Sequence, residues 1–219
     1  MAKKKKKVST PYDGIDELNI LLFKNLNKYF NQTRLKLTTK KKENINYSLI
    51  QRETKSLYNK IQKEVLDNYL KCAKEINRGI DRDELLDFLE DFYIVTKYAY
   101  FNEWERKQQR YAETLNAINQ NGKSFSSVEA LQEQKKAVNY LKKQIDEYGV
   151  YVIDQAIFSL AKKQEKGNKE IELKWVTEQD EKVCPICKKR NGKVYNIRKY
   201  PSKPHWGCRC YPEIINKGM

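Results

Sequence analysis

Residues 44–78 of this chain read NINYSLIQRETKSLYNKIQKEVLDNYLKCAKEINR, and this stretch decides the fold class. Its apolar side chains recur at steps of three or four residues, at Tyr58, Ile61, Val65, Tyr69, Cys72 and Ile76. This spacing places them on one face of an α-helix, because the helix turns once every 3.6 residues. A long amphipathic helix needs partners that cover its apolar face. The stretch therefore predicts a bundle of long helices, in which Cys72 is a buried apolar residue.

A second apolar stripe precedes this stretch, and the polar, basic run from Thr38 to Lys42 separates the two. It predicts a first helix from near Gly14 to about Leu37. Gly79 is expected to form the C-terminal cap of the second helix, because glycine readily adopts the left-handed conformation that ends many helices.

Two more helices are predicted after the second. A third helix is expected to begin at Asp81 or Asp83, either of which can cap its N-terminus, and to continue as one element to Asn121. A fourth is expected to open at Ser126 or Ser127. The tyrosines on these stripes are expected at half-buried positions, with the ring covered and the hydroxyl group in water.

The fourth helix is expected to break or kink near Tyr148-Gly149, because glycine lowers helix stability, and then to resume to about Lys166. Gly167-Asn168 is expected to end it.

Residue 168 marks a change in the character of the chain. Residues 171–176 (IELKWV) alternate between apolar and polar types, which is typical of a β-strand, and Gly and Pro are frequent after them. We therefore expect a disordered basic arm over residues 1–13, a helical domain over residues 14–168 and a separate module, whose chemistry is described below, over residues 169–219. The predicted fold class is mainly α, with long amphipathic helices forming an elongated bundle and a small C-terminal α+β module.

The chain is strongly basic, with 44 Lys and Arg against 29 Asp and Glu and a formal net charge of +15. A field of this sign attracts polyanions such as nucleic acid, although a well-solvated surface and a basic tail give the same composition. The candidate phosphate-binding residues are Lys3, Lys4, Lys5, Lys6, Lys7, Arg190, Lys193, Arg198, Lys199 and Arg209. No apolar segment follows the basic N-terminus, and no run approaches the length of a membrane span, so we expect a soluble protein made in a cytoplasm.

The chemistry of the chain is concentrated in two short motifs, residues 184–187 (CPIC) and residues 205–210 (HWGCRC). A Cys-x2-Cys turn places two thiolates on one side of a tight loop, which is half of a tetrahedral zinc site. The second half can come from His205 and Cys208 or from Cys208 and Cys210, because five donors compete for about four positions. The five candidate ligands are Cys184, Cys187, His205, Cys208 and Cys210. The preferred four ligands are Cys184, Cys187, His205 and Cys208, and Cys210 is the first candidate to replace one of them.

A structural zinc ion suits this segment, because residues 169–219 are too few and too polar to form a core of their own. Binding of zinc contributes folding free energy directly, on the order of 10 kcal/mol in small zinc peptides. A disulfide pair and an unliganded cysteine cluster are the alternatives.

A catalytic zinc ion is disfavoured by the sequence. His205 is the only histidine, so a His-Glu-x-x-His protease motif is impossible. The His-x-Glu motif of zinc deaminases, which precedes their Pro-Cys-x-x-Cys, is also missing, and no Gly-x-x-x-x-Gly-Lys phosphate loop occurs. A site filled by four protein ligands leaves no position for a substrate, so we expect no enzymatic activity and no catalytic residues.

The C-terminal motifs together resemble a known family. They are WVT at residues 175–177, DEKVCPIC at 180–187, NGKVY at 191–195 and PHWGCRC at 204–210. In this order they are similar to the C-terminal domain of the Mu F-like family of phage head morphogenesis proteins, which are minor head proteins. The first 145 residues match nothing by motif.

The resemblance implies a minor component of a tailed-phage head that associates with the portal protein inside the procapsid and influences head assembly, DNA packaging or ejection. Scaffolding or major capsid protein and packaged DNA are further implied partners, and the implied location is the virion, inside the capsid, after synthesis in the host cytoplasm. Two other hypotheses remain from the residues themselves. One is a zinc-containing nucleic-acid-binding protein outside the virion, and the other is a metal-dependent nuclease or toxin-like enzyme with a catalytic His205.

Overall fold

A computed structural model describes residues 10–90, 100–165, 171–178, 183–205 and 207–215 of the chain. The first two ranges contain α1 (Asp13–Thr38), α2 (Tyr47–Ile76), α3 (Arg82–Glu90), α4 (Tyr100–Gln120) and α5 (Val128–Glu165), with a short 3-10 helix at Lys42–Asn44. The prediction of a mainly helical fold is confirmed.

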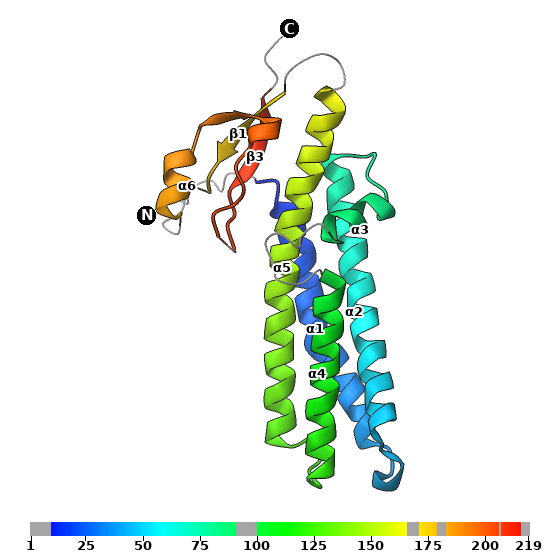
Figure 1. Cartoon of the computed structure of the whole chain (residues 1–219). Coiled ribbons are helices and arrows are strands. Elements are labelled where there is room, and N and C mark those ends of the chain that lie inside the picture. Colours follow the sequence, from blue (N-terminus) through cyan, green and yellow to red (C-terminus); the bar gives the residue numbers. More distant parts are fainter. Residues whose placement is uncertain (1–9, 91–99, 166–170, 179–182, 206, 216–219) are drawn as a thin grey trace, which may run out of the picture.

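Helices α1, α2, α4 and α5 lie along one another and form an elongated bundle (Figure 1). Large aromatic side chains fill its interior. The ring of Phe30 lies 5.3 Å from that of Tyr111 and 6.2 Å from that of Tyr58, and the ring of Tyr58 lies 6.1 Å from that of Trp104, all edge to face. These contacts join α1, α2 and α4 around one apolar core, since edge-to-face pairs stabilise beyond the area that they bury.

The third predicted helix is wrong as a single element. Residues of α3 lie within 8 Å of residues of α4. In one straight helix the end of α3 and the start of α4 would lie about 15 Å apart, because each residue adds 1.5 Å along the axis. α3 and α4 are therefore not parts of one straight helix. Residues 91–99, which carry part of the predicted stripe, lie outside the described residues.

The predicted break near Tyr148-Gly149 is also wrong, because α5 is a single helix from Val128 to Glu165. Instead, Gly149 lies where α1 and α2 pack closely against α5. A Cβ atom at this position would lie 2.8 Å from Cγ1 of Ile15 and 3.2 Å from Cε1 of Tyr69. The missing side chain lets α1 and α2 approach α5 closely, and this packing outweighs the low helix propensity of glycine.

Two of the predicted N-terminal capping residues are confirmed. The Asp81 carboxylate accepts a hydrogen bond from the Glu84 amide at 2.9 Å, and the Ser127 hydroxyl accepts one from the Ala130 amide at 3.3 Å. The cap expected at Gly79 is wrong. The last helical residue of α2 is Ile76, followed by Asn77 in an extended conformation, and the Asn77 side chain accepts the Gly79 amide at 3.1 Å.

Several tyrosines are buried more completely than the sequence indicated. Tyr69 and Tyr100 are fully buried, together with their hydroxyl groups. The Tyr69 hydroxyl donates a 2.5 Å hydrogen bond to the carbonyl oxygen of Ile145 in α5. A buried hydroxyl group can thus use a backbone acceptor on a neighbouring helix in place of water.

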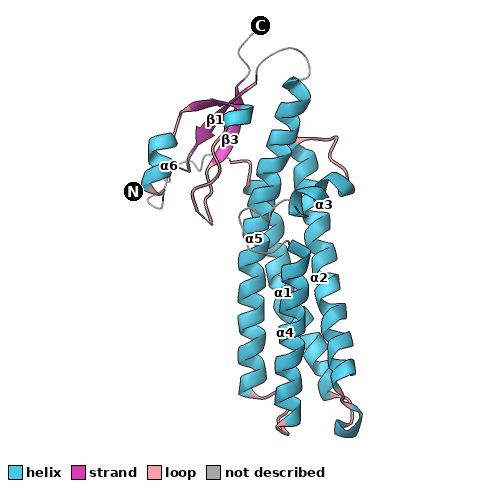
Figure 2. Ribbon diagram, viewed as in Figure 1, coloured by secondary structure: helices cyan, strands magenta, loops and turns pink. Residues whose placement is uncertain are grey.

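The C-terminal part contains β1 (Glu172–Val176), α6 (Pro185–Arg190), β2 (Val194–Asn196), a 3-10 helix (Ile197–Lys199) and β3 (Tyr211–Ile215). The strand expected at residues 171–176 is confirmed as β1. It is the central strand of an antiparallel sheet of order β2-β1-β3 (Figure 2), in which Leu173 lies opposite Tyr195 on one side and Ile214 on the other.

This sheet packs against the C-terminal half of α5, beside the bundle (Figure 1). Leu173 and Ile197 are buried against Ala161, and Phe158 and Ile214 pack around them. The C-terminal module therefore shares an apolar contact with the longest helix and does not stand apart from the bundle.

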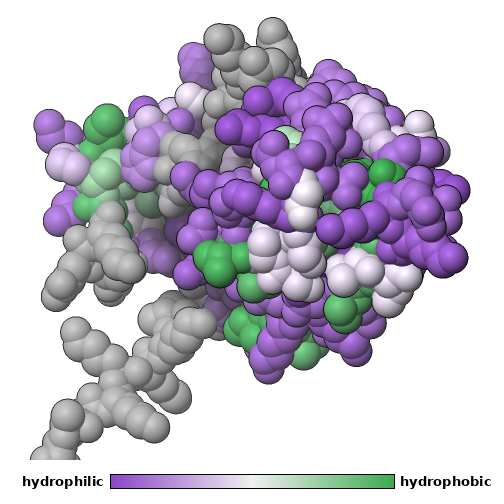
Figure 3. Space-filling model, turned by 90° about the horizontal axis from the view of Figure 1, so that it is seen from below, coloured by the Kyte–Doolittle hydropathy of each residue, from purple (hydrophilic) through white to green (hydrophobic). Residues whose placement is uncertain are grey.

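The end of the bundle that carries the α1–α2 and α4–α5 connections has a mostly hydrophilic surface, with separate hydrophobic patches (Figure 3). Leu35, Val128 and Leu131 are among the exposed apolar residues of these helices. None of the described helices has both the length and the apolar composition that crossing a membrane requires.

Candidate metal centre

The first two candidate ligands are positioned by helix α6. Cys184 is its N-cap and Pro185 occupies its first turn, where a proline costs no hydrogen bond. The Cys184 sulfur accepts the backbone N–H of Cys187 at 3.4 Å. This hydrogen bond favours the thiolate and lowers the pKa of Cys184. The Cys-Pro-x-Cys sequence thus places both sulfurs on the same turn.

The remaining candidates lie on the segment that leads into β3. Gly207 has a φ of 76°, a left-handed conformation that glycine adopts without strain. This turn lies between His205, which is exposed, and Cys208, which is 4% exposed. Cys210 directly precedes β3 and is 5% exposed.

The five predicted donors gather around one sulfur, that of Cys187. The ligand atoms of Cys184, Cys187 and His205 all lie within 4.8 Å of one another. The same holds for Cys187, Cys208 and Cys210, and the Cys187 and Cys208 sulfurs are 3.6 Å apart. The fold therefore joins the two motifs through Cys187, and both ways of completing a four-ligand set stay open.

The pKa values of the three buried sulfurs are shifted in different directions. Donation from the Cys210 thiol lowers the pKa of Cys208 to about 5, whereas burial raises the pKa of Cys187 to about 12. The hydrogen bond to Cys208 and burial raise the pKa of Cys210 as well. Sulfurs this close cannot all ionise in a low-dielectric interior unless a cation compensates their charge. The cluster can hold a metal ion, and sulfur with imidazole is the donor set that zinc prefers.

The candidate metal centre is attached to the bundle by side chains that lie between or beside the candidate ligands. Arg209 forms ion pairs with Asp16 of α1 at 2.7 Å and with Glu178 at 3.4 Å. Lys203 forms an ion pair with the buried Asp154 of α5 at 2.5 Å. Burial raises the pKa of Asp154, and Lys203 opposes the rise.

Tyr12 also takes part in the contact between the candidate metal centre and the bundle. Its burial shows that the expected disordered arm over residues 1–13 was drawn too long. Helix α1 begins at Asp13, and Tyr12, placed in the disordered arm by the sequence, is fully buried. Its hydroxyl donates to Asp154 at 2.7 Å and lies 3.1 Å from the Cys210 carbonyl oxygen. The guanidinium of Arg209 lies 5.0 Å from the centre of its ring. Sequence reasoning missed Tyr12, Asp154 and Lys203, although a carboxylate within the apolar run at residues 150–158 signals a buried partner.

The candidate phosphate-binding residues have different environments. Lys3, Lys4, Lys5, Lys6 and Lys7 lie outside the described residues. Arg190 donates to the Ser202 carbonyl oxygen at 2.8 Å and lies over the Trp175 ring, and Arg209 is held by its two carboxylates. Lys193, Arg198 and Lys199 are exposed, and Arg198 lies 3.6 Å from Glu165.

The family model of the phage Mu protein F like proteins matches residues 59–212. The chain belongs to this family. The resemblance to phage head morphogenesis proteins is thereby confirmed. No curated protein and no solved structure matches the chain.

The Mu F-like match is longer than the C-terminal motifs indicated. It begins within α2, runs through α3, α4 and α5, and ends in β3. All five candidate ligands lie inside it. Short sequence motifs do not reveal the helical part of the match, because many different apolar residues can occupy a helix face as long as their spacing is kept.

Proposed function

We propose that this Mu F-like chain is a non-catalytic minor head protein of a tailed phage, which binds the portal protein inside the procapsid. Its role there is in head assembly, DNA packaging or ejection. The observation that carries the proposal is the family match over residues 59–212, which includes most of the bundle and the whole candidate metal centre. Other head proteins are the expected partners.

The architecture is consistent with a structural role. The bundle and the C-terminal module share an apolar contact at Ala161 and a polar contact made by Tyr12, Asp154, Lys203 and Arg209. A rigid, elongated protein can connect two components of an assembly over the length of its helices, since each residue of a helix adds 1.5 Å.

The proposal assigns a structural zinc ion to the cluster around Cys187. When bound, zinc would be held by four of the five donors and would cross-link α6 to the segment before β3. A filled set of protein ligands has no position for a substrate, so we expect no nuclease activity on plasmid DNA in the presence of zinc.

Proteomics of purified particles tests the location. Procapsids and virions of the phage that encodes the chain should both contain it, and affinity-tagged chain should retain portal protein from infected cells. A phage that lacks the gene should be complemented by the wild-type gene and by Cys72→Ala, whose side chain is buried in the bundle, but not by Cys187→Ser. Absence of the chain from both kinds of particle would overturn the proposal.

The net charge of +15 favours a second candidate, direct binding of nucleic acid without a place in the virion. The affinity for double-stranded DNA should then fall steeply with added salt, because bound phosphates release condensed counterions. Exposed Lys193 and Lys199 provide the test residues: their replacement by Ala should reduce the salt dependence, whereas replacement of the internally held Arg190 should not. Strong DNA binding combined with absence from particles would favour this candidate over the first.

A further inference from the structure

The positive charge of the described residues is concentrated in one segment of the C-terminal module. Residues 183–205, here called the basic segment, contain seven Lys and Arg and no Asp or Glu. All other described residues together contain 27 Lys and Arg against 25 Asp and Glu, so they are nearly neutral. The basic segment includes α6, β2 and the 3-10 helix that follows β2. A charge this localised indicates a surface with an acidic partner, since charge that serves solubility alone has no need to gather in one place.

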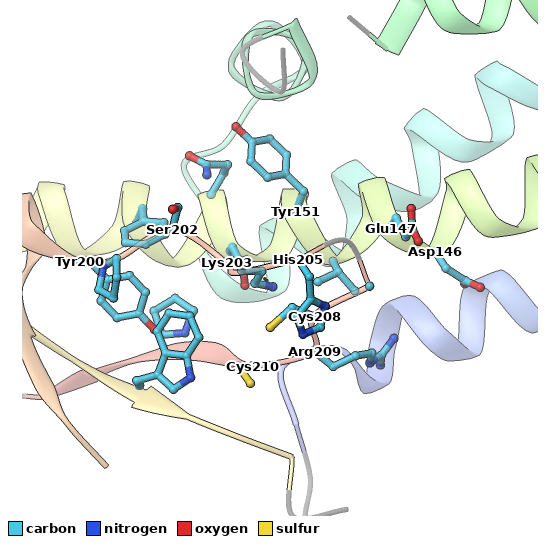
Figure 4. A pocket seen from close by; sticks show the side chains of 18 of the residues that line it. Asp146, Glu147, Tyr151, Tyr200, Ser202, Lys203, His205, Cys208, Arg209 and Cys210 are labelled. Carbon is cyan, nitrogen blue, oxygen red and sulfur yellow. Dashed lines mark ion pairs between the residues drawn. The ribbon is translucent and has the colours of Figure 1, made fainter. Parts of the chain in front are cut away.

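Three cations of the basic segment are engaged within the chain. Arg190 lies over the Trp175 ring, and Arg198 lies 3.6 Å from a Glu165 oxygen. Lys203 lies beside α5, where it is paired with Asp154 (Figure 4). The other four are exposed and form no ion pair with any carboxylate that the structure describes; they are Lys188, Lys189, Lys193 and Lys199. These four charges are available to a partner.

The basic segment also exposes two apolar side chains. Ile186 is 49% exposed and Val194 is 45% exposed. Binding of nucleic acid depends mainly on contacts between cations and phosphate groups, to which aliphatic side chains add little. Protein interfaces combine apolar contact area with charges at their rim. The basic segment therefore fits an acidic protein surface better than it fits nucleic acid.

Helix α3 provides a surface of this kind on the same chain. Residues 81–90 contain five Asp and Glu against one Arg. Within the described part of the chain, no ion pair involves the exposed carboxylates of Asp83, Asp87 and Glu90. Leu86 and Phe88 of the same helix are only partly buried, so apolar atoms lie beside these carboxylates. The two surfaces are thus complementary in charge, and both include apolar groups.

The basic segment and α3 cannot meet within one molecule. The module with α6 and the helix α3 lie on opposite sides of α5, at a similar level along the bundle (Figure 1). Two copies that lie side by side can instead bring the basic segment of one against α3 of the next. Because the surfaces lie on opposite sides, such a pair does not close on itself and leaves one surface of each kind free.

We propose that the chain associates with itself head to tail, through contact between the basic segment of one copy and α3 of the next. The opposite charges set which surfaces meet. Exposed ion pairs contribute little free energy, so the association is weak and depends on concentration and salt. The inference goes beyond the proposed function and does not depend on a place in the phage head.

Sedimentation velocity of the zinc-loaded full chain, freed of nucleic acid by a nuclease, tests the inference. We expect the average mass to rise with protein concentration and to exceed that of a dimer at about 1 mM, near the limit of specific binding. Raising the salt concentration from about 50 mM to about 500 mM should weaken association at least about tenfold, because exposed charges are screened. A wild type that stays monomeric at about 1 mM in low salt overturns the proposal. Association that the nuclease abolishes also overturns it, because nucleic acid then bridges the copies.

Two triple variants identify the surfaces. One carries Lys188→Ala, Lys189→Ala and Lys193→Ala, and the other carries Asp83→Asn, Asp87→Asn and Glu90→Gln. Each variant alone should associate at least about tenfold more weakly than wild type, since it lacks one of the two charged surfaces. Their equimolar mixture should form a complex of two chains and nothing larger, because a mixed pair has one intact contact and leaves two neutral surfaces.

The matched control removes three lysines from the connection between α1 and α2. Lys40→Ala, Lys41→Ala and Lys42→Ala change exposed side chains outside both surfaces, and this variant should associate within about twofold of wild type. Circular dichroism and zinc content should be the same for all variants, because every replaced side chain is exposed. The proposal is overturned if either test variant associates like wild type or if the control is weakened as much as they are. A mixture of the two test variants that stays monomeric overturns it as well.

Discussion

Arg209 and Asp16 form an ion pair with an N···O distance of 2.7 Å, although 193 residues separate them in the sequence. Arg209 lies between two candidate metal ligands, Cys208 and Cys210, and Asp16 lies in the first turn of α1. The pair therefore joins the candidate metal centre to the start of the bundle. Replacing either residue should therefore destabilise both the C-terminal module and the bundle.

Replacing Arg209 by Ala should lower the free energy of unfolding by about 2 kcal/mol, because the carboxylates of Asp16 and Glu178 lose a charged donor and the Tyr12 ring loses its cation. Asp16→Asn should cost about 1 kcal/mol. Urea unfolding of the zinc-loaded proteins measures both. Arg198→Ala is the control, since Arg198 is 79% exposed, and it should change stability by less than about 0.5 kcal/mol. Equal effects of Arg209→Ala and Arg198→Ala would contradict this account.

Elemental analysis of the purified chain should find about one zinc ion per molecule. Cys187→Ser should reduce the occupancy below about a tenth, because Cys187 belongs to both donor groups, and it should lower the melting temperature as strongly as a chelator does. Cys72→Ala should retain full occupancy. Comparison of Cys184→Ser, His205→Ala and Cys210→Ser then identifies the donor that the ion does not need. A metal-free wild type with an unchanged melting temperature in chelator would refute the assignment.

Gly149→Ala should destabilise the protein by about 1 to 2 kcal/mol, although alanine normally stabilises a helix relative to glycine. The added Cβ atom would lie 2.8 Å from Cγ1 of Ile15, so α1 or α5 must shift. Asn139→Ala, at an exposed position of the same helix, is the matched control and should be neutral or slightly stabilising. Thermal and urea unfolding distinguish the two, and a stabilised Gly149→Ala protein would show that the helices do not pack this closely.

Asp154→Ala should lower the free energy of unfolding by about 2 to 3 kcal/mol at neutral pH, because Lys203 and the Tyr12 hydroxyl lose their shared partner. The control is Asp67→Ala. Asp67 also forms an ion pair, with Arg82 at 3.0 Å, but both side chains are about half exposed, so its loss should cost less than about 1 kcal/mol. Similar losses for the two variants would argue against a buried contact between the module and α5.

Glu103 should make the bundle sensitive to acid. Burial raises its pKa, but hydrogen bonds from Arg106 and Tyr140 outweigh this effect, and the pKa is lowered. Its stabilising contribution is therefore complete above the unfolded-state pKa of about 4.3 and is lost as the pH falls through the lower, folded-state pKa. Glu103→Gln should be less stable than wild type by about 1 to 2 kcal/mol at pH 7.

The difference between wild type and Glu103→Gln should shrink between pH 5 and pH 2, measured by urea unfolding at each pH. Acid also protonates the cysteine and histidine donors of the candidate metal centre, but this effect is common to both proteins and cancels in the difference. A difference that stays constant over this range would show that the Glu103 carboxylate has an ordinary pKa in the folded protein.

Local sequence patterns predicted many of the helices and strands. The stripe from Tyr58 to Ile76 predicted α2, Asp81 and Ser127 were among the expected caps, and the alternation at residues 171–176 predicted β1. These features depend on residues that are near one another in sequence, so their signals are visible in a single chain. The errors at residues 82–120 and at Tyr148-Gly149 arose because the path of the chain depends on contacts with other helices.

By itself, the sequence determined which atoms can bind a metal, because only the two motifs at residues 184–187 and 205–210 bring four cysteines and the single histidine near one another along the chain. It also determined the helical class, through the period of its apolar residues. Only the tertiary structure decided that these donors meet at Cys187 and that Arg209 reaches Asp16. It also decided that the basic segment and α3 lie on opposite sides of α5. The physical reason is that periodicity reports which face of an element is apolar, whereas its partner depends on shape and charge complementarity between segments far apart in the chain.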